Sequence, residues 1–263
     1  MVAVVASSLS GPCCDIPVMR SGTLILLHGW AQHAGVWDIV RDRFSGLGYR
    51  IYSPDLPGHG QSEIPFPPRL HELRDWMEQL LSRHEQVFLL GWSLGGVIAT
   101  YMMTQFPAKV SGLITVGTLP NMKDAMPESA RQSFRMLLHQ DAFRAVQRLT
   151  ALMALGDCCS KDIRSYFRKS FQNRSPAAVS TLCNGYDMLM NADLESSMHQ
   201  IKKPCLLLSG ERDYFIPEEA WQACQKRMPA VHFQRIRDTG HAPFVSRPED
   251  FVRRVEQFIR DTQ

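Results

Sequence analysis

A serine surrounded by closely spaced glycines is the first candidate for chemistry in this sequence. Positions 91–96 are Gly-Trp-Ser-Leu-Gly-Gly. The apolar run 87–90 before them predicts a strand, and the pattern after them predicts a helix. So tight a turn leaves no space for side chains at positions 91 and 95 and directs Ser93 outward. We interpret the segment as a nucleophile elbow around Ser93; the alternative is a glycine-rich turn with an incidental serine.

A serine hydroxyl becomes an effective nucleophile when a histidine takes its proton and a carboxylate orients that histidine. Five of the nine histidines (71, 84, 139, 199 and 232) lie on predicted helices or strands, and His241 alone has the expected position of the base, in the loop after the last predicted strand. Asp213 follows another predicted strand through a short turn, and Glu211 and Asp238 are nearby alternatives for the acid. We therefore expect Ser93, Asp213 and His241 to act together as a catalytic triad.

Acyl transfer also needs hydrogen-bond donors for the oxygen that becomes negatively charged in the transition state. The segment 28–30 follows the first predicted strand, and Leu94 follows Ser93 directly. The backbone N–H groups of Trp30 and Leu94 are therefore the candidates for an oxyanion hole. His28 has two possible roles, a structural hydrogen bond beneath this loop, which we favour, and a second base.

These residues must be positioned by elements that alternate along most of the chain. The predicted strands are 24–27, 50–53, 87–90, 110–116, 205–209 and 231–236. The predicted helices are 36–44, 70–84, 94–105, 218–228 and 248–260. Continuous apolar strands that alternate with helices predict an α/β fold with a doubly wound, mostly parallel sheet buried on both faces.

The alternation stops between positions 120 and 200, where the pattern is helical throughout. We interpret 120–200 as a helical lid inserted into one α/β core that comprises residues 1–119 and 201–263. At the beginning of that core, Met1–Leu9 is expected to be an edge strand or a ragged start.

Composition excludes several other classes of protein. The net charge of +3 is too small to make a nucleic acid the default partner. No apolar stretch approaches the roughly 20 residues that cross a bilayer. The seven cysteines have no C-x-x-C spacing, which fits a reducing, cytoplasmic compartment. No metal-ligand motif occurs, the loop 55–62 lacks the lysine of a phosphate-binding loop, and we expect no metal and no cofactor.

From Leu24 to about Ile259 the chain resembles the α/β-hydrolase superfamily, in which nucleophile, acid and base follow one another in this order. Within it, the tryptophans at positions 30 and 92 and the segment His-Ala-Pro-Phe at 241–244 resemble the carboxylesterases of biotin synthesis that act on pimeloyl-acyl-carrier-protein methyl ester.

That resemblance implies an α/β-hydrolase fold with the lid inserted after the sixth strand. It implies a cytoplasmic, monomeric carboxylic ester hydrolase whose partner is an acyl carrier protein that carries a pimeloyl methyl ester. Carried over by position, Ser93, Asp213 and His241 correspond to the triad and Trp30 and Leu94 to the oxyanion residues. The segment 149–153 corresponds to the contacts of the acyl chain.

We expect the acyl pocket between the carboxyl edge of the sheet and the lid. Its expected walls are Trp30, Trp92, Leu149, Leu152 and Met153. Helical spacing places the last three on one face of a helix. The alternative is that these three side chains only pack the lid onto the core.

The lid is strongly basic. Between positions 131 and 174 there are nine basic and three acidic residues, which gives this segment a net charge of +6. Arg144 with Arg148, and Arg164 with Arg168, are spaced so that each pair shares one helix face. We interpret these four arginines as the docking site of an acidic carrier protein; a solvated helix surface is the alternative.

Two other functions compete with this interpretation. One is a different hydrolase on the same scaffold, such as a lipase, a thioesterase or a carbon–carbon bond hydrolase that acts on a small free substrate. The other is a non-catalytic receptor that binds a small molecule in the pocket. The complete set of Ser93, Asp213 and His241 argues against the receptor.

Overall fold

The computed structural model describes residues 22–171 and 177–263, and its centre is a parallel sheet of six strands in the order β2-β1-β3-β4-β5-β6. The strands are β1 (Thr23–Leu27), β2 (Arg50–Tyr52), β3 (Val87–Trp92), β4 (Val110–Val116), β5 (Cys205–Gly210) and β6 (His232–Ile236). Each matches one predicted strand, with bounds that differ by at most two residues. The predicted α/β class is confirmed, and the segment Met1–Leu9 lies outside the described residues.

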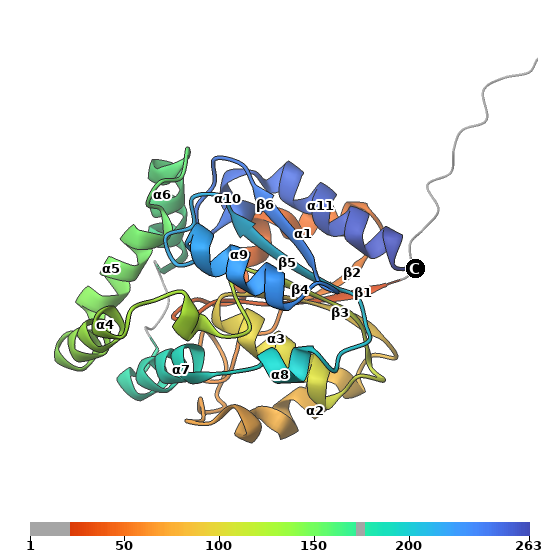
Figure 1. Cartoon of the computed structure of the whole chain (residues 1–263). Coiled ribbons are helices and arrows are strands. Elements are labelled where there is room, and N and C mark those ends of the chain that lie inside the picture. The colour runs from red at the N-terminus through yellow and green to blue at the C-terminus, as the bar shows by residue number, and fades with distance from the viewer. Residues whose placement is uncertain (1–21, 172–176) are drawn as a thin grey trace, which may run out of the picture.

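Helices cover both faces of this sheet (Figure 1). The core helices are η1 (Ala34–Trp37), α1 (Asp38–Gly46), η2 (Leu70–Leu73), α2 (Arg74–Ser82), α3 (Leu94–Gln105), α9 (Glu218–Arg227), α10 (Pro243–Ser246) and α11 (Pro248–Asp261). Strand side chains alternate between the faces, so Leu24 and Leu26 pack with α1 and α11, whereas Ile25 and Leu27 pack with α2, α3 and α9. Burial on both sides explains why the strands are apolar without interruption.

A helical segment separates β4 from β5. It contains η3 (Met122–Asp124), α4 (Glu128–Gln140), α5 (Ala142–Met153), α6 (Ser160–Phe171), α7 (Val179–Asn191) and α8 (Glu195–Met198). We call residues 120–200 the insertion. In Figure 1, α4, α5 and α6 lie together at one side of the sheet.

The two ends of the insertion meet. Asn121 and Asp193 form an isolated antiparallel bridge, and the Leu194 N–H donates to the Pro120 carbonyl at 3.0 Å. The chain therefore leaves and rejoins the core at neighbouring points, which leaves the sheet order intact. That the insertion acts as a lid stays a prediction.

The resemblance places the insertion after a sixth strand, whereas in the described part of the chain it follows β4, the fourth. β1 is the first strand of the described residues, which begin at position 22. None of the described helices is long and apolar enough to cross a membrane.

Candidate active site

Ser93 occupies a strained turn between β3 and α3. Its φ of 54° and ψ of −118° lie in a region of backbone angles that residues other than glycine rarely adopt. A Cβ atom at Gly91 would lie 2.2 Å from the Gly95 carbonyl oxygen, and one at Gly95 would lie 2.2 Å from the Leu27 carbonyl oxygen. Only glycine fits at these two positions, as the sequence predicts for a nucleophile elbow.

Asp213 and His241 form a buried hydrogen-bonded pair. The Nδ1 atom of His241 lies 2.9 Å from Oδ2 and 3.0 Å from Oδ1 of Asp213. The same carboxylate accepts hydrogen bonds from the Phe215 N–H at 2.9 Å and from the Ser209 hydroxyl at 3.1 Å. A proton on Nδ1 leaves Nε2 as the nitrogen with a free lone pair, which is the form that a general base needs.

The two alternative acids are engaged elsewhere. Asp238 forms an ion pair with Arg212, and Glu211 accepts a hydrogen bond from the Asp238 N–H at 3.2 Å. Both hydrogen bonds are exposed. Asp213 is therefore the carboxylate that contacts His241.

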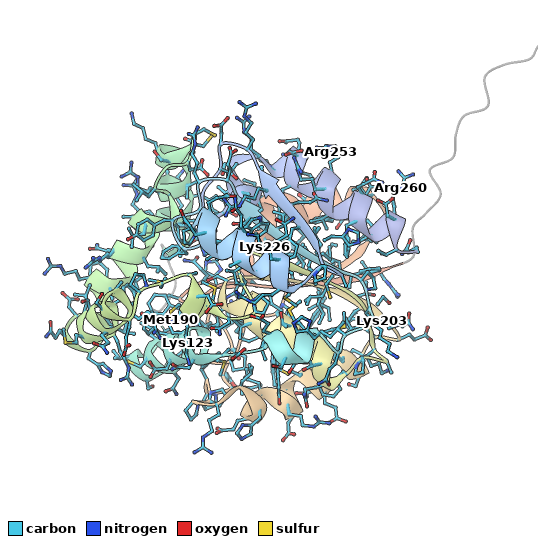
Figure 2. All side chains as sticks on the ribbon, in the orientation of Figure 1. Lys123, Met190, Lys203, Lys226, Arg253 and Arg260 are labelled. Atoms are coloured by element: carbon cyan, nitrogen blue, oxygen red, sulfur yellow. The ribbon has the colours of Figure 1, made fainter. Side chains whose placement is uncertain are left out.

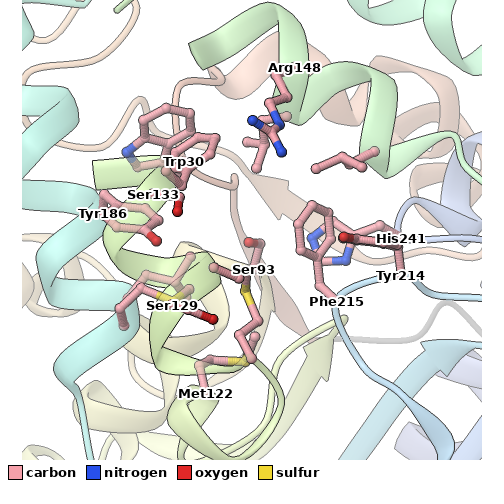
Figure 3. Close-up of a pocket in the computed structure, with 17 residues that line it drawn as sticks. Trp30, Ser93, Met122, Ser129, Ser133, Arg148, Tyr186, Tyr214, Phe215 and His241 are labelled. Carbon is pink, nitrogen blue, oxygen red and sulfur yellow. The ribbon is translucent and has the colours of Figure 1, made fainter. Parts of the chain in front are cut away.

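Ser93 and His241 open onto one cavity of about 270 Å³ (Figure 3). Ser93 is 8% exposed, and its hydroxyl makes no hydrogen bond within residues 22–171 and 177–263. Contacts between a catalytic serine and its base often tighten only when a substrate is bound. The two side chains thus meet a ligand in the same space.

Of the two predicted oxyanion donors, Leu94 directly follows Ser93, and Trp30 lies in the loop after β1. Neither the Trp30 nor the Leu94 backbone N–H donates a hydrogen bond within the described part of the chain. Leu94 begins α3, where the helix dipole favours negative charge. A Cβ atom at Gly29 would lie 3.3 Å from the Ser93 Cβ atom, so the loop after β1 reaches the nucleophile.

His28 has the structural role rather than that of a second base. Its Nε2 accepts from the Leu56 N–H at 2.9 Å, and its Nδ1 lies 2.9 Å from the Gly29 carbonyl oxygen. Both ring nitrogens are engaged and the side chain is fully buried. The loop 55–62 is structural as well, because the Asp55 carboxylate accepts from the Ala34 and Gln61 N–H groups at 2.6 and 2.8 Å.

Three of the five predicted pocket residues line the cavity, namely Trp30, Leu149 and Leu152. The predictions for Trp92 and Met153 are wrong. Trp92 packs on the face of the sheet that α1 and α11 cover. There it stacks on Phe167 and donates from Nε1 to the His241 carbonyl at 2.9 Å. Met153 is 2% exposed and packs in that same layer.

A family model described as the alpha/beta hydrolase fold matches residues 22–248. The chain belongs to the α/β-hydrolase family. The resemblance stated from the motifs is confirmed.

Relatives of this α/β-hydrolase carry a common name. A pimeloyl-(acyl-carrier protein) methyl ester esterase from Nitrosomonas europaea is 32% identical over 235 residues, which cover 87% of this chain and 92% of the relative. One from Yersinia enterocolitica is 32% identical over 245 residues, which cover 91% of this chain and 93% of the relative. These relatives are esterases by name, in agreement with the enzyme class predicted for this chain.

Solved structures share the fold of this α/β-hydrolase. A bromoperoxidase from Bacillus anthracis has a TM-score of 0.80 at 17% identity and covers 92% of each chain. An esterase from Thermogutta terrifontis has a TM-score of 0.75 at 20% identity and covers 92% of this chain and 90% of its own. At these identities the likeness shows the fold alone.

Most of the cavity wall of this α/β-hydrolase comes from residues that sequence reasoning missed. They are Met122, Met126, Ser129, Ala130, Ser133 and Phe134 around α4, Tyr186, Leu189 and Met190 on α7, and Tyr214 and Phe215 after β5. Their apolar members recur at helical spacing, which predicts burial but not which space the side chains face.

Tyr186 fixes one side of this wall. Its ring lies 4.9 Å from that of Phe134 and 6.5 Å from that of Trp30, centroid to centroid. Its hydroxyl donates to the Arg131 carbonyl at 3.0 Å, and burial raises its pKa to about 12. The phenol therefore stays neutral and keeps α7 attached to α4 across the physiological pH range.

The four predicted docking arginines are all exposed, on α5 and α6. Arg148 also lines the cavity, and together with Arg144 it lines a surface groove on α5. None of Arg144, Arg148, Arg164 and Arg168 forms an ion pair with another described residue. By contrast, Arg135 is paired with Asp187 at 2.8 Å.

One group in the described residues has metal-ligand chemistry. The ligand atoms of Asp157, Cys158 and Cys159 lie within 4.8 Å of one another. Both oxygens of Asp157 already accept short hydrogen bonds from protein donors. This carboxylate is therefore committed to the fold and is a poor ligand.

Proposed function

We propose that this chain is a serine carboxylesterase that hydrolyses the methyl ester of a pimeloyl chain carried on an acyl carrier protein. The observation that carries the proposal is the buried pair of Asp213 and His241, whose histidine lines an apolar cavity together with Ser93. The names of relatives that are 32% identical over most of their length support the substrate.

In the proposed reaction, the Ser93 oxygen attacks the ester carbonyl while Nε2 of His241 takes its proton. Asp213 holds the proton on Nδ1 and stabilises the imidazolium that forms. The N–H groups of Trp30 and Leu94 donate to the oxyanion. His241 then returns the proton to the leaving methoxide, so methanol departs and an acyl-enzyme remains at Ser93.

Water completes the reaction by the same route in reverse. His241 removes a proton from a water molecule that attacks the acyl-enzyme, and the bond between the acyl carbon and the Ser93 oxygen breaks. The proton returns to Ser93 and a carboxylic acid leaves, which ionises by losing its own proton to solvent. Water is the only co-reactant that these steps require.

The cavity suits a long apolar acyl chain. Aliphatic and aromatic side chains make up most of its wall, and of the described residues that line it, Arg148 is the one arginine or lysine. Methylene groups gain about 0.8 kcal/mol each when they leave water, so a chain of several methylenes is held mainly by burial. The arm of a carrier protein docked on α5 and α6 would reach Ser93 past Arg148.

The proposed triad makes Asp213 essential and Asp238 dispensable. We expect Asp213→Asn to lower kcat about 10⁴-fold, because the amide no longer holds the required tautomer of His241. The matched control is Asp238→Asn, an identical change three residues from His241 that removes only exposed ion pairs, those with Arg212 and Arg237. Steady-state hydrolysis of p-nitrophenyl acetate measures both, and a larger loss in the control would refute the assignment of the acid.

The proposed acyl pocket predicts chain-length selectivity. Leu152→Trp should fill the cavity and cut kcat/KM for a seven-carbon methyl ester at least tenfold, while an acetate ester is spared. The control is Leu155→Trp, at an exposed position just after the end of α5, the helix that carries Leu152. If Leu152→Trp lowers thermal stability and both activities together, Leu152 packs the insertion and does not select the substrate.

The proposed carrier docking predicts a salt-dependent KM. Each exposed ion pair contributes about 0.2 to 1 kcal/mol, so reversal of Arg144, Arg148, Arg164 and Arg168 to glutamate removes roughly 2 kcal/mol, or about 30-fold in affinity. We expect KM to rise for the carrier-bound ester only. The difference should shrink at 1 M salt, where the Debye length is about 3 Å.

The control for this prediction reverses four exposed cations on other elements, so the total charge changes equally. Lys203, Lys226, Arg253 and Arg260 lie away from α5 and α6 in Figure 2. Their reversal should leave KM for the carrier-bound ester near that of the wild type. Equal effects of the two sets would show that only net charge matters, and the docking site would be abandoned.

A further inference from the structure

We infer that Asp157, a residue of the insertion, positions the base His241 for catalysis. This inference rests on the proposed function, because it assigns Asp157 a part in the alignment of the proposed triad. The two residues are 84 positions apart in sequence. They belong to different parts of the fold, since Asp157 follows α5 and His241 follows β6.

The Asp157 carboxylate is buried and accepts three short hydrogen bonds. Its Oδ2 atom accepts from the Gly240 N–H at 2.6 Å and from the Ser246 hydroxyl at 2.7 Å. Its Oδ1 atom accepts from the Cys159 N–H at 2.7 Å. The side chain is 7% exposed. One carboxylate thus joins its own loop, the residue before the base and the short helix α10 that follows the base.

Backbone hydrogen bonds on both sides of Asp157 reinforce this contact. The His241 N–H donates to the Met153 carbonyl at 3.2 Å, and the Cys158 N–H donates to the Asp238 carbonyl at 3.0 Å. A Cβ atom at Gly240 would lie 2.9 Å from the Met153 carbonyl oxygen. The end of α5 therefore packs directly against the loop that carries His241.

The core holds this loop at points other than the amides of residues 240 and 241: the Arg212 N–H donates to the Thr239 carbonyl at 2.9 Å, and the Asp238 N–H donates to Glu211 at 3.2 Å. Trp92 holds the His241 carbonyl from β3, and Asp213 holds the imidazole from the loop after β5. The amides of residues 240 and 241 both donate to the insertion. Asp238 has a positive φ of 60°, so the loop is bent in a conformation that other contacts must maintain.

Removal of Asp157 would leave a buried N–H at Gly240 without its acceptor. The loop would then shift to find another partner, and His241 would move with it. A displacement of about 1 Å in a catalytic group can cost 10²-fold in rate. Asp157 is therefore a positioning residue, which acts on the reaction through His241 and does not touch the substrate.

The test compares Asp157→Ala with Asp141→Ala in the full-length protein. Asp141 is the matched control because it also lies in the insertion and accepts an N–H group, that of Arg144 at the start of α5, at 2.9 Å. We expect Asp157→Ala to lower kcat for p-nitrophenyl acetate ten- to a hundredfold with KM within twofold of the wild type. Asp141→Ala should change kcat less than threefold.

A second readout does not depend on turnover. A proton held between Nδ1 of His241 and Asp213 is expected to give a low-field proton NMR signal, whose position depends on the distance between the nitrogen and the carboxylate. We expect this signal to shift or broaden in Asp157→Ala and to stay in place in Asp141→Ala. Wild-type kcat together with an unchanged signal in Asp157→Ala overturns the inference. So does a loss of kcat that is proportional to the loss of thermal stability in the same way in Asp157→Ala and Asp141→Ala.

If the alanine variant does not fold, Asp157→Asn replaces it. A carboxamide offers one oxygen for the three donors, so it must rotate and loosen the bond to Gly240. We expect a three- to tenfold loss of kcat and a shifted signal, and wild-type values for both would overturn the inference. Failure of the proposed function is distinct, because the wild type would then neither hydrolyse the ester nor react with a fluorophosphonate.

Discussion

The site depends on one steric constraint, the absence of side chains at positions 91 and 95. Cβ atoms at these positions would lie 2.2 Å from backbone carbonyl oxygens. Glycine is therefore required at both positions for β3 to continue directly into α3. The consequence is the positive φ of Ser93, which costs on the order of 1 to 3 kcal/mol and is maintained by the surrounding sheet. The same turn brings the N–H of Leu94 to the helix terminus beside the nucleophile.

Two parts of the fold divide the work at this site. The core positions Ser93, Asp213 and His241 after β3, β5 and β6, at the carboxyl edge of the parallel sheet, which is where such sheets bind their ligands. The insertion supplies most of the apolar wall and the exposed arginines. In the proposed function, the core thus supplies the chemistry, and the insertion selects the molecule that reaches it.

The sequence predicts the core well because its signals are local. An apolar run, a glycine-flanked serine and a loop histidine each depend on a few neighbouring residues, and parallel strands bring their ends together without further information. The errors at Trp92 and Met153 have a common cause. Nearness in sequence to Ser93 or to Leu152 does not say on which side of a strand or helix a side chain lies.

Most of the cavity wall could not be predicted from the sequence, for a different reason. Tyr186 and Phe134 meet only because α7 packs against α4, and the crossing of two helices is decided by tertiary contacts. The bond between Asp157 and Gly240 joins segments 83 residues apart. Amphipathic spacing indicates that such residues are buried, but the partner becomes evident only in the folded chain.

The most direct test of this account is to trap the acyl-enzyme. The protein is mixed with pimeloyl-acyl-carrier-protein methyl ester, quenched in acid within milliseconds and analysed by mass spectrometry for the enzyme, its adduct and methanol. The proposed mechanism predicts a covalent species of enzyme, acyl chain and carrier linked at Ser93, formed together with one equivalent of methanol and absent in Ser93→Ala. Methanol release by Ser93→Ala at the wild-type rate would contradict it.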